Sequence, residues 1–218
     1  ATKAEIAARE PGSVWLLENL RFMKGEEKND AKFARKLAAL GTIYVNDAFA
    51  ATHRKHASIV GIAKYLPAYA GFQLERERAG LTQAMERGEH PIIVILGGAK
   101  TEDKIPIIKN LLPQADAILL GGGIANTALK VQGIDMEESL YGKTAMPTMK
   151  KMLRSKKIVV PIDWDVNDRA ILDIGNASIK LFAEYIQKAK TIIWNGPMGK
   201  CEDARFKEGS KAIAEAVA

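Results

Sequence analysis

Three short apolar runs in the second half of the chain each end in a glycine-containing turn. They lie in the segments 91–104 (PIIVILGGAKTEDK), 116–129 (DAILLGGGIANTAL) and 190–202 (KTIIWNGPMGKCE). Each run has the length of a strand that is buried on both faces, which is typical of parallel sheets. We expect the glycine turns to leave backbone N–H groups unobstructed at the carboxyl ends of these strands, where open α/β sheets bind phosphates and nucleotides. Three such turns in one domain indicate an enzyme that handles nucleotides.

The rest of the pattern alternates between helices and strands. A helix is expected over 25–40, capped by Asn29 or Asp30, and a strand over 42–45. An apolar run at 14–17 is interpreted as a further strand. The other expected elements are strands at 92–96, 117–120, 157–162, 170–174 and 191–194, and helices at 102–112, 124–132, 144–153, 178–188 and from 206 onward. This alternation is typical of βαβ units, so the predicted fold class is α/β with parallel sheets.

A long charged helix is expected between these two regions, over about 73–87. Its few apolar positions are mixed with many charges, and residues 88–91 interrupt it before the next strand. The pattern fits a connector between two lobes and also fits a surface helix of a single domain. Both interpretations stay open at this point.

Composition limits the class of protein. A chain of 218 residues with 47% hydrophobic content can bury one large core or two small ones. No uninterrupted apolar span is long enough for a membrane helix, and residues 1–12 lack the apolar centre of a secretory signal. The single cysteine, Cys201, excludes an internal disulfide and fits the reducing cytoplasm.

The net charge of +6 does not point to nucleic acid. Basic residues are interspersed with acidic ones, as in ERERAGLTQAMERGE (75–89), which is typical of a solvated helix face. No basic run is interleaved with aromatic residues, which make up only 6% of the chain. The excess of cations fits small anionic substrates at least as well, and most of these charges are expected to be solvated surface.

Two lysines follow the first glycine turn. Lys100 and Lys104 lie four residues apart around the start of a helix, on one face of it. Their spacing from Gly97 and Gly98 does not fit the Walker A pattern. Because the helix dipole disfavours cations at a helix N-terminus, a bound polyanion is the simplest reason to place two lysines there. The alternative is that both are surface lysines.

The other two glycine turns carry weaker signals. The run Gly121–Gly123 offers a flat backbone surface for a base or phosphate, or is a flexible loop. Asn126 occupies the last position of a Gly-x-Gly-x-x-Gly pattern, so a dinucleotide site is disfavoured. The loop from Asn195 to Gly199 is stiffened by Pro197. Glu202 is interpreted as an acceptor for ribose hydroxyls or as a solvated surface carboxylate.

Candidate anion-binding residues also occur in the first part of the chain. Arg21 and the cluster His53–His56 each follow the end of an expected strand, and an arginine fork matches carboxylate and phosphate geometry. His56 is interpreted as a structural donor or as a ligand contact. No cluster has metal-ligand spacing and no Gly-x-Ser-x-Gly turn occurs, so neither a protein-built metal site nor a serine nucleophile is expected.

Six segments occur in one order over nearly the whole chain: LLENLRF (16–22), YVNDAFAATHRKHAS (44–58), LGGAKTEDKI (96–105), LLGGG (119–123), LDIG (172–175) and WNGPMG (194–199). In order and spacing they resemble the phosphoglycerate kinase family. The resemblance implies phosphoryl transfer between 1,3-bisphosphoglycerate and ADP, with magnesium, in glycolysis. It also implies two Rossmann-like lobes joined by a helix: an incomplete phosphoglycerate lobe at 1–72, the helix at 73–88 and a nucleotide lobe at 89–218.

The resemblance assigns roles to the candidate residues. Arg21, His53 and Arg54 match the part of the family that binds phosphoglycerate, and Lys100, Arg21 and Arg54 are the expected catalytic residues. The expected nucleotide-binding residues lie on the three glycine turns: Gly97, Gly98, Lys100, Lys104, Gly121, Gly122, Gly123, Asn195, Gly196, Pro197, Gly199 and Glu202. The expected ligands are ATP or ADP with Mg²⁺. A cytoplasmic monomer without nucleic-acid or membrane partners is expected.

The chain also departs from the family pattern. The family's opening segment, its Ser-His-x-Gly-Arg-Pro segment and the Gly-Gly-Gly-Asp loop that holds the metal-nucleotide are absent from the sequence. Three interpretations follow: a partial record of a whole enzyme, a truncated nucleotide-binding module without turnover, or a basic nucleic-acid-binding or scaffold protein on the same fold. The first two agree with a nucleotide site, and the metal ligand is expected outside this chain.

Overall fold

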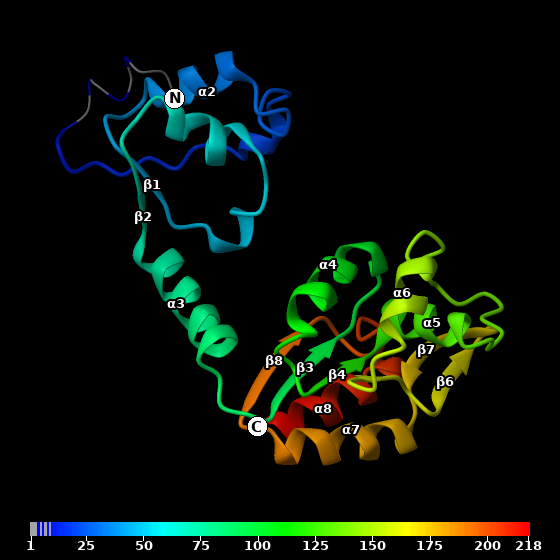
Figure 1. Ribbon diagram of the computed structural model, residues 1–218. Coiled ribbons are helices and arrows are strands. Elements are labelled where there is room, and N and C mark those ends of the chain that lie inside the picture. Colours follow the sequence, from blue (N-terminus) through cyan, green and yellow to red (C-terminus); the bar gives the residue numbers. More distant parts are fainter. Residues whose placement is uncertain (1–3, 5, 7, 9) are drawn as a thin grey trace. The chain divides into compact units, whose positions relative to one another are not determined.

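A computed structural model describes residues 4, 6, 8 and 10–218, so part of the segment 1–12 that was inspected for a secretory signal lies outside the described residues. The chain divides into two compact units, Ala1–Leu81 and Thr82–Ala218 (Figure 1). Each unit has its own parallel strands, which confirms the predicted α/β class.

The second unit is built on a four-stranded parallel sheet. Its strands, in spatial order, are β5 (Ile158–Val159), β4 (Ala117–Leu120), β3 (Ile92–Leu96) and β8 (Thr191–Asn195). Helices α4 (Thr101–Leu111), α5 (Gly122–Val131) and α6 (Met146–Met152) lie on one face, and α7 (Asn176–Lys188) and α8 (Glu208–Val217) on the other (Figure 1). The three apolar runs are therefore neighbouring strands whose carboxyl ends meet at one edge of the sheet.

The central strand β3 shows why the run is apolar at every position. Val94 and Leu96 pack into the core under α4, α5 and α6, whereas Ile93 and Ile95 pack into the core under α7 and α8. All four are at most 2% exposed. Because both faces are covered, no position of the strand tolerates a polar residue.

An antiparallel hairpin adjoins this sheet domain. It consists of β6 (Trp164–Asn167) and β7 (Ala170–Ile174). Asp168 and Arg169 form its turn, with φ of 47° and 64°. The sequence predicted β7 but not β6, because Asp165 and Asn167 break the apolar run and β6 is only partly buried. The expected strand at 157–162 is also shorter, since only two of its residues pair with β4.

The first unit contains one parallel strand pair, β1 (Tyr44–Asn46) with β2 (Ala68–Ala70), and short helical turns around helix α2 (Ala31–Ala38). The expected helix at 25–40 begins only at Ala31, because the Asp30 carboxylate accepts a hydrogen bond from the backbone N–H of Phe33 at 2.8 Å and caps it. The expected strand at 14–17 is wrong. The described residues 14–17 adopt no strand conformation, and Val14 and Leu16 are exposed.

The long charged helix is α3 (Phe72–Glu86), and the division between the two units falls inside it. The carboxylate of Asp47, at the end of β1, accepts the backbone N–H of Leu74 at 2.9 Å, which fixes the start of the helix. The division into 1–72, 73–88 and 89–218 stays a prediction. Within the described part of the chain, no helix combines the length and the apolar character that crossing a membrane requires.

Candidate functional site

The three glycine turns bind to one another at the carboxyl edge of the sheet. The N–H of Gly97 donates to the carbonyl of Asn195 at 3.0 Å, and the N–H of Gly98 donates to that of Pro197 at 2.7 Å. The N–H of Gly122 donates to the backbone carbonyl of Met198 at 2.7 Å. The turns that follow β3, β4 and β8 therefore form one continuous backbone surface.

This arrangement corrects the expectation that the glycine N–H groups are unobstructed. The N–H groups of Gly121 and Gly123 are also occupied, by the carbonyls of Leu96 at 2.8 Å and Gly98 at 3.0 Å. The glycines are needed for close approach instead. A Cβ on Gly97 would overlap the carbonyl oxygen of Pro197, and Gly98 and Gly122 have φ of +91° and +55°.

Free donors remain at the N-terminus of α4. The first N–H groups of a helix have no intrahelical acceptor, and no side chain caps this helix. Lys100 occupies the N-cap position and is exposed. Lys104 follows in the first turn, where its ammonium group donates a short hydrogen bond to Oδ1 of Asn195. Partial burial lowers the pKa of Lys104, although Asp103 nearby opposes the shift. This helix end can bind an anion through both its backbone and Lys100.

A hollow of about 330 Å³ lies beside the glycine turns, a size in the range of small-molecule sites. Six predicted nucleotide residues line it: Gly98, Gly122, Gly123, Pro197, Gly199 and Glu202. The remaining lining residues are Ala99, Asn126, Leu140, Ile171, Leu172 and Lys200. One wall is backbone and the opposite wall is largely apolar, which suits a flat ring with a polar edge.

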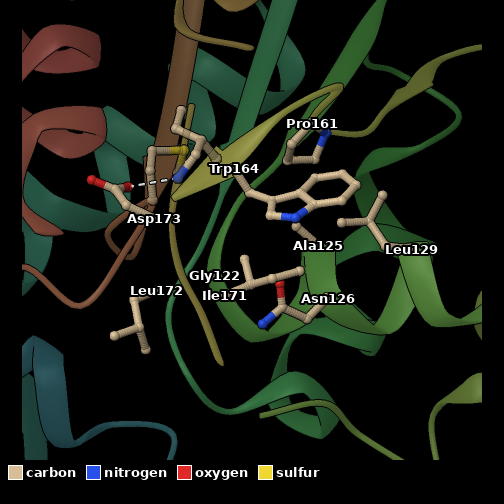
Figure 2. Close-up of a pocket in the computed structure, with 11 residues that line it drawn as sticks. Gly122, Ala125, Asn126, Leu129, Pro161, Trp164, Ile171, Leu172 and Asp173 are labelled. Carbon is tan, nitrogen blue, oxygen red and sulfur yellow. Dashed lines mark hydrogen bonds between the residues drawn. The ribbon is translucent and has the colours of Figure 1, made fainter. Parts of the chain in front are cut away.

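Figure 2 shows what supports this wall. Ile171 and Leu172 of β7, with Asn126 of α5, also line a smaller cavity behind the hollow, of about 10 Å³, on which the indole of Trp164 lies. The side-chain amide of Asn126 donates to the carbonyl of Leu140 at 3.1 Å. The hairpin that the sequence only half predicted therefore forms one side of the site.

The predicted residues of the second unit divide into two groups. Besides the six that line the hollow, Gly97, Gly121 and Gly196 lie under it as packing positions. Lys100, Lys104 and Asn195 lie at the start of α4 instead. Sequence reasoning missed the apolar wall at Leu140 and Ile171, and the only signal for it was the strand expected at 170–174.

The candidates of the first unit lie on short turns. Arg21 is exposed in a 3₁₀ turn, Leu20–Phe22, and does not follow a strand. His53 is exposed, whereas Arg54 is half-buried and its Nε has no hydrogen-bond partner among the residues that the structure describes. An unpaired buried N–H is costly, so Arg54 is suited to a ligand that supplies an acceptor.

A buried carboxylate holds the segment next to Arg54. Glu26 is 2% exposed, and its carboxylate accepts the N–H of Ser58 at 3.0 Å and a short hydrogen bond from the Ser58 hydroxyl. Nδ1 of His56 lies 3.6 Å from the same carboxylate, which favours the structural interpretation of His56. The pKa of Tyr44 is raised by burial and, secondarily, by Glu26.

Replacing Glu26 with glutamine is expected to destabilise the first unit by about 1–3 kcal/mol, because one Ser58 donor would face an amide N–H₂. Hydrogen exchange over residues 26–61, followed by mass spectrometry, measures this loss. Glu27→Gln is the matched control, since Glu27 is exposed. Equal protection in the two variants would contradict the prediction.

Comparison with known proteins identifies the family. The phosphoglycerate kinase family model matches residues 1–218. The phosphoglycerate kinase of Thermomicrobium roseum is 44% identical over 239 residues, which cover 98% of this chain and 61% of that protein. That of Roseiflexus castenholzii is 46% identical over 241 residues, which cover 99% of this chain and 61% of that protein. The chain belongs to the phosphoglycerate kinase family.

Solved phosphoglycerate kinases share the architecture. The structure from Pyrococcus horikoshii has a TM-score of 0.87 at 30% identity and covers 99% of this chain and 62% of that one. The structure from Coxiella burnetii has a TM-score of 0.76 at 35% identity and covers 96% of this chain and 60% of that one. The chain thus spans about three fifths of the length of the phosphoglycerate kinases it matches.

Among residues 4, 6, 8 and 10–218, no group of three or more His, Cys, Asp or Glu side chains is arranged to hold a metal ion.

Proposed function

We propose that this chain supplies the nucleotide lobe and part of the phosphoglycerate lobe of a phosphoglycerate kinase, which transfers a phosphoryl group between 1,3-bisphosphoglycerate and ADP. One observation carries this proposal: six predicted nucleotide residues line one hollow beside the uncapped start of α4. Family membership adds support from sequence.

Each part of the site has a proposed role. The base lies against Gly122 and Gly123 and the apolar wall, and Glu202 accepts hydrogen bonds from the ribose. The nucleotide phosphates extend toward the start of α4. There the backbone donors bind them, and Lys104, held by Asn195, anchors them.

Lys100 is proposed to neutralise charge on the transferring phosphoryl group, because its exposed side chain lies at the N-cap of α4. Arg21, His53 and Arg54 are proposed to orient the phosphoglycerate. Phosphoryl transfer depends on positioning and charge stabilisation more than on a nucleophile, which agrees with the absence of a strong base among these residues.

Calorimetry with the 218-residue chain tests the nucleotide site. ADP is expected to bind, and adenosine is expected to bind more weakly, since it lacks the phosphates that the start of α4 would hold. A coupled assay on the same sample measures turnover. Binding of ADP without turnover is the result that the truncated-module alternative predicts. Failure to bind ADP would overturn the proposal.

The protein is further proposed to act on small molecules as a cytoplasmic monomer, without nucleic-acid or membrane partners. The nucleic-acid alternative predicts retention on DNA that weakens steeply with salt. Measuring retention on single-stranded and duplex DNA at low salt decides between them.

A further inference from the structure

A buried carboxylate lies where the apolar wall meets the glycine loop after β8. Asp173, near the end of β7, is 3% exposed. Its carboxylate accepts the backbone N–H of Ile174 at 2.9 Å, drawn as a dashed line in Figure 2, and that of Gly209 at 2.8 Å. Gly209 lies in the first turn of α8, so this side chain joins the hairpin to that helix.

Two glycines make room for this carboxylate. A Cβ on Gly199 or on Gly209 would overlap the Asp173 carboxyl group. The family resemblance implies that Gly199 binds the nucleotide. The structure gives a reason for a glycine at this position, since the loop can approach β7 only if residue 199 has no side chain.

Two further hydrogen bonds fasten the same loop. The N–H of Lys200 donates to the carbonyl of Leu172 at 2.8 Å, and the N–H of Met198 donates to the Ser210 hydroxyl at 2.9 Å. The loop is thus held by β7 on one side and by α8 on the other. Leu172 precedes Asp173 in β7, and Ser210 follows Gly209 in α8. These two hydrogen bonds therefore lie next to the one that joins Asp173 to Gly209.

We infer that Asp173 is a positioning residue for the nucleotide loop, which sets the placement of Pro197, Gly199 and Glu202 in the hollow. This inference rests on the proposed nucleotide site. Asp173 touches no reacting atom, and it acts by holding β7, the loop and α8 in one register.

The surroundings of Asp173 shift its pKa, and this shift predicts how the stability of wild type and of Asp173→Asn should differ as the pH changes. Burial raises its pKa, the hydrogen bonds from Gly209 and Ile174 lower it, and Asp165 and Glu208 raise it further, so that the net shift is upward. A raised folded-state pKa means that its contribution to stability is complete below the ordinary value of 3.8 and is lost as pH rises through the folded-state pKa. Asparagine does not titrate, so the stability of wild type relative to Asp173→Asn should fall with rising pH in this window.

The matched control is Asp163→Asn. The Asp163 carboxylate accepts the N–H of Ala177 at 2.8 Å and that of Ser178 at 2.6 Å, at the start of α7, and it lies beside Gly175 in the same way. Asp163 therefore also joins a carboxylate to a helix start, although it is less buried than Asp173 and additionally accepts the Ser178 hydroxyl at 2.6 Å. The two variants remove the same charge and the same kind of helix-start contact.

The experiment compares ADP affinity by calorimetry in wild type, Asp173→Asn and Asp163→Asn, with thermal unfolding measured alongside. Both variants are expected to lose stability, but only Asp173→Asn should raise the dissociation constant for ADP, by about tenfold, as one buried donor loses its acceptor. Hydrogen exchange should accelerate at residues 196–202 in Asp173→Asn alone.

Equal ADP affinity in wild type and Asp173→Asn, or equal weakening in both variants, would overturn the inference. If wild type itself fails to bind ADP, the proposed function fails, and the exchange measurement then judges the positioning role separately. Faster exchange at 196–202 in Asp173→Asn but not in Asp163→Asn supports that role, and identical exchange rejects it.

Discussion

Gly97→Ala is expected to abolish measurable ADP binding and to destabilise the second unit by about 3 kcal/mol, the upper end of ordinary overpacking costs. The added methyl would overlap the backbone oxygen of Pro197 and lie 2.9 Å from the Met198 methyl group. Backbone cannot rotate away as a side chain can. The turns after β3 and β8 must therefore separate, and the hydrogen bond from Gly98 to Pro197 is lost with them.

Thermal unfolding and ADP calorimetry measure the two effects. Gly80→Ala is the control, because Gly80 lies in α3 with open space around its Cα and should gain helix propensity. Normal stability and normal ADP affinity in Gly97→Ala would show that the close approach of the two turns is not required.

Lys100→Ala is expected to lower kcat by about 10²–10³-fold in an enzyme that turns over, with a much smaller change in ADP affinity. The reason is that Lys100 is exposed at the N-cap of α4, whereas Lys104 donates to Asn195 and is partly buried. An ammonium group that gains its contact as charge develops during transfer lowers the barrier, whereas one that binds the ground state equally well does not.

Steady-state kinetics and calorimetry on the same variant separate the two contributions. Lys109→Ala serves as control, since Lys109 is exposed near the other end of the same helix. Equal proportional losses in turnover and in ADP affinity would reject the role given to Lys100.

Elements buried on both faces were predicted almost to the residue. Strands β3 and β4 agree with the expected 92–96 and 117–120, because complete burial leaves an uninterrupted apolar run. The edge strand β8, which is only partly buried, extends one residue beyond the expected 191–194. The glycine turn after each strand was also placed correctly. These features depend on residues that are near one another in the chain.

Elements that depend on a distant partner were predicted poorly. Strand β6 pairs with β7 through a hairpin whose outer face is polar, and β2 exists only because it pairs with β1, so neither shows an apolar pattern of its own. The run at 14–17 has the opposite property, since its residues are apolar but the structure assigns it no strand. The periodicity of apolar residues indicates which side chains are buried. It does not indicate which backbone N–H and C=O groups pair with another strand.

The same contrast holds for the site. The sequence alone shows which strands are followed by glycine turns and lysines, because these residues come directly after the apolar runs. Only the tertiary structure shows what the glycines do: the N–H groups of Gly97–Gly98 and Gly121–Gly123 donate to backbone carbonyls of neighbouring turns and strands, and the Asp173 carboxylate fills the space left at Gly199. It also brings Ile171 and Leu172 opposite the glycine backbone to close the hollow. Contacts between segments distant in the chain depend on how sheets and helices pack, and nothing in the neighbouring residues encodes them one by one.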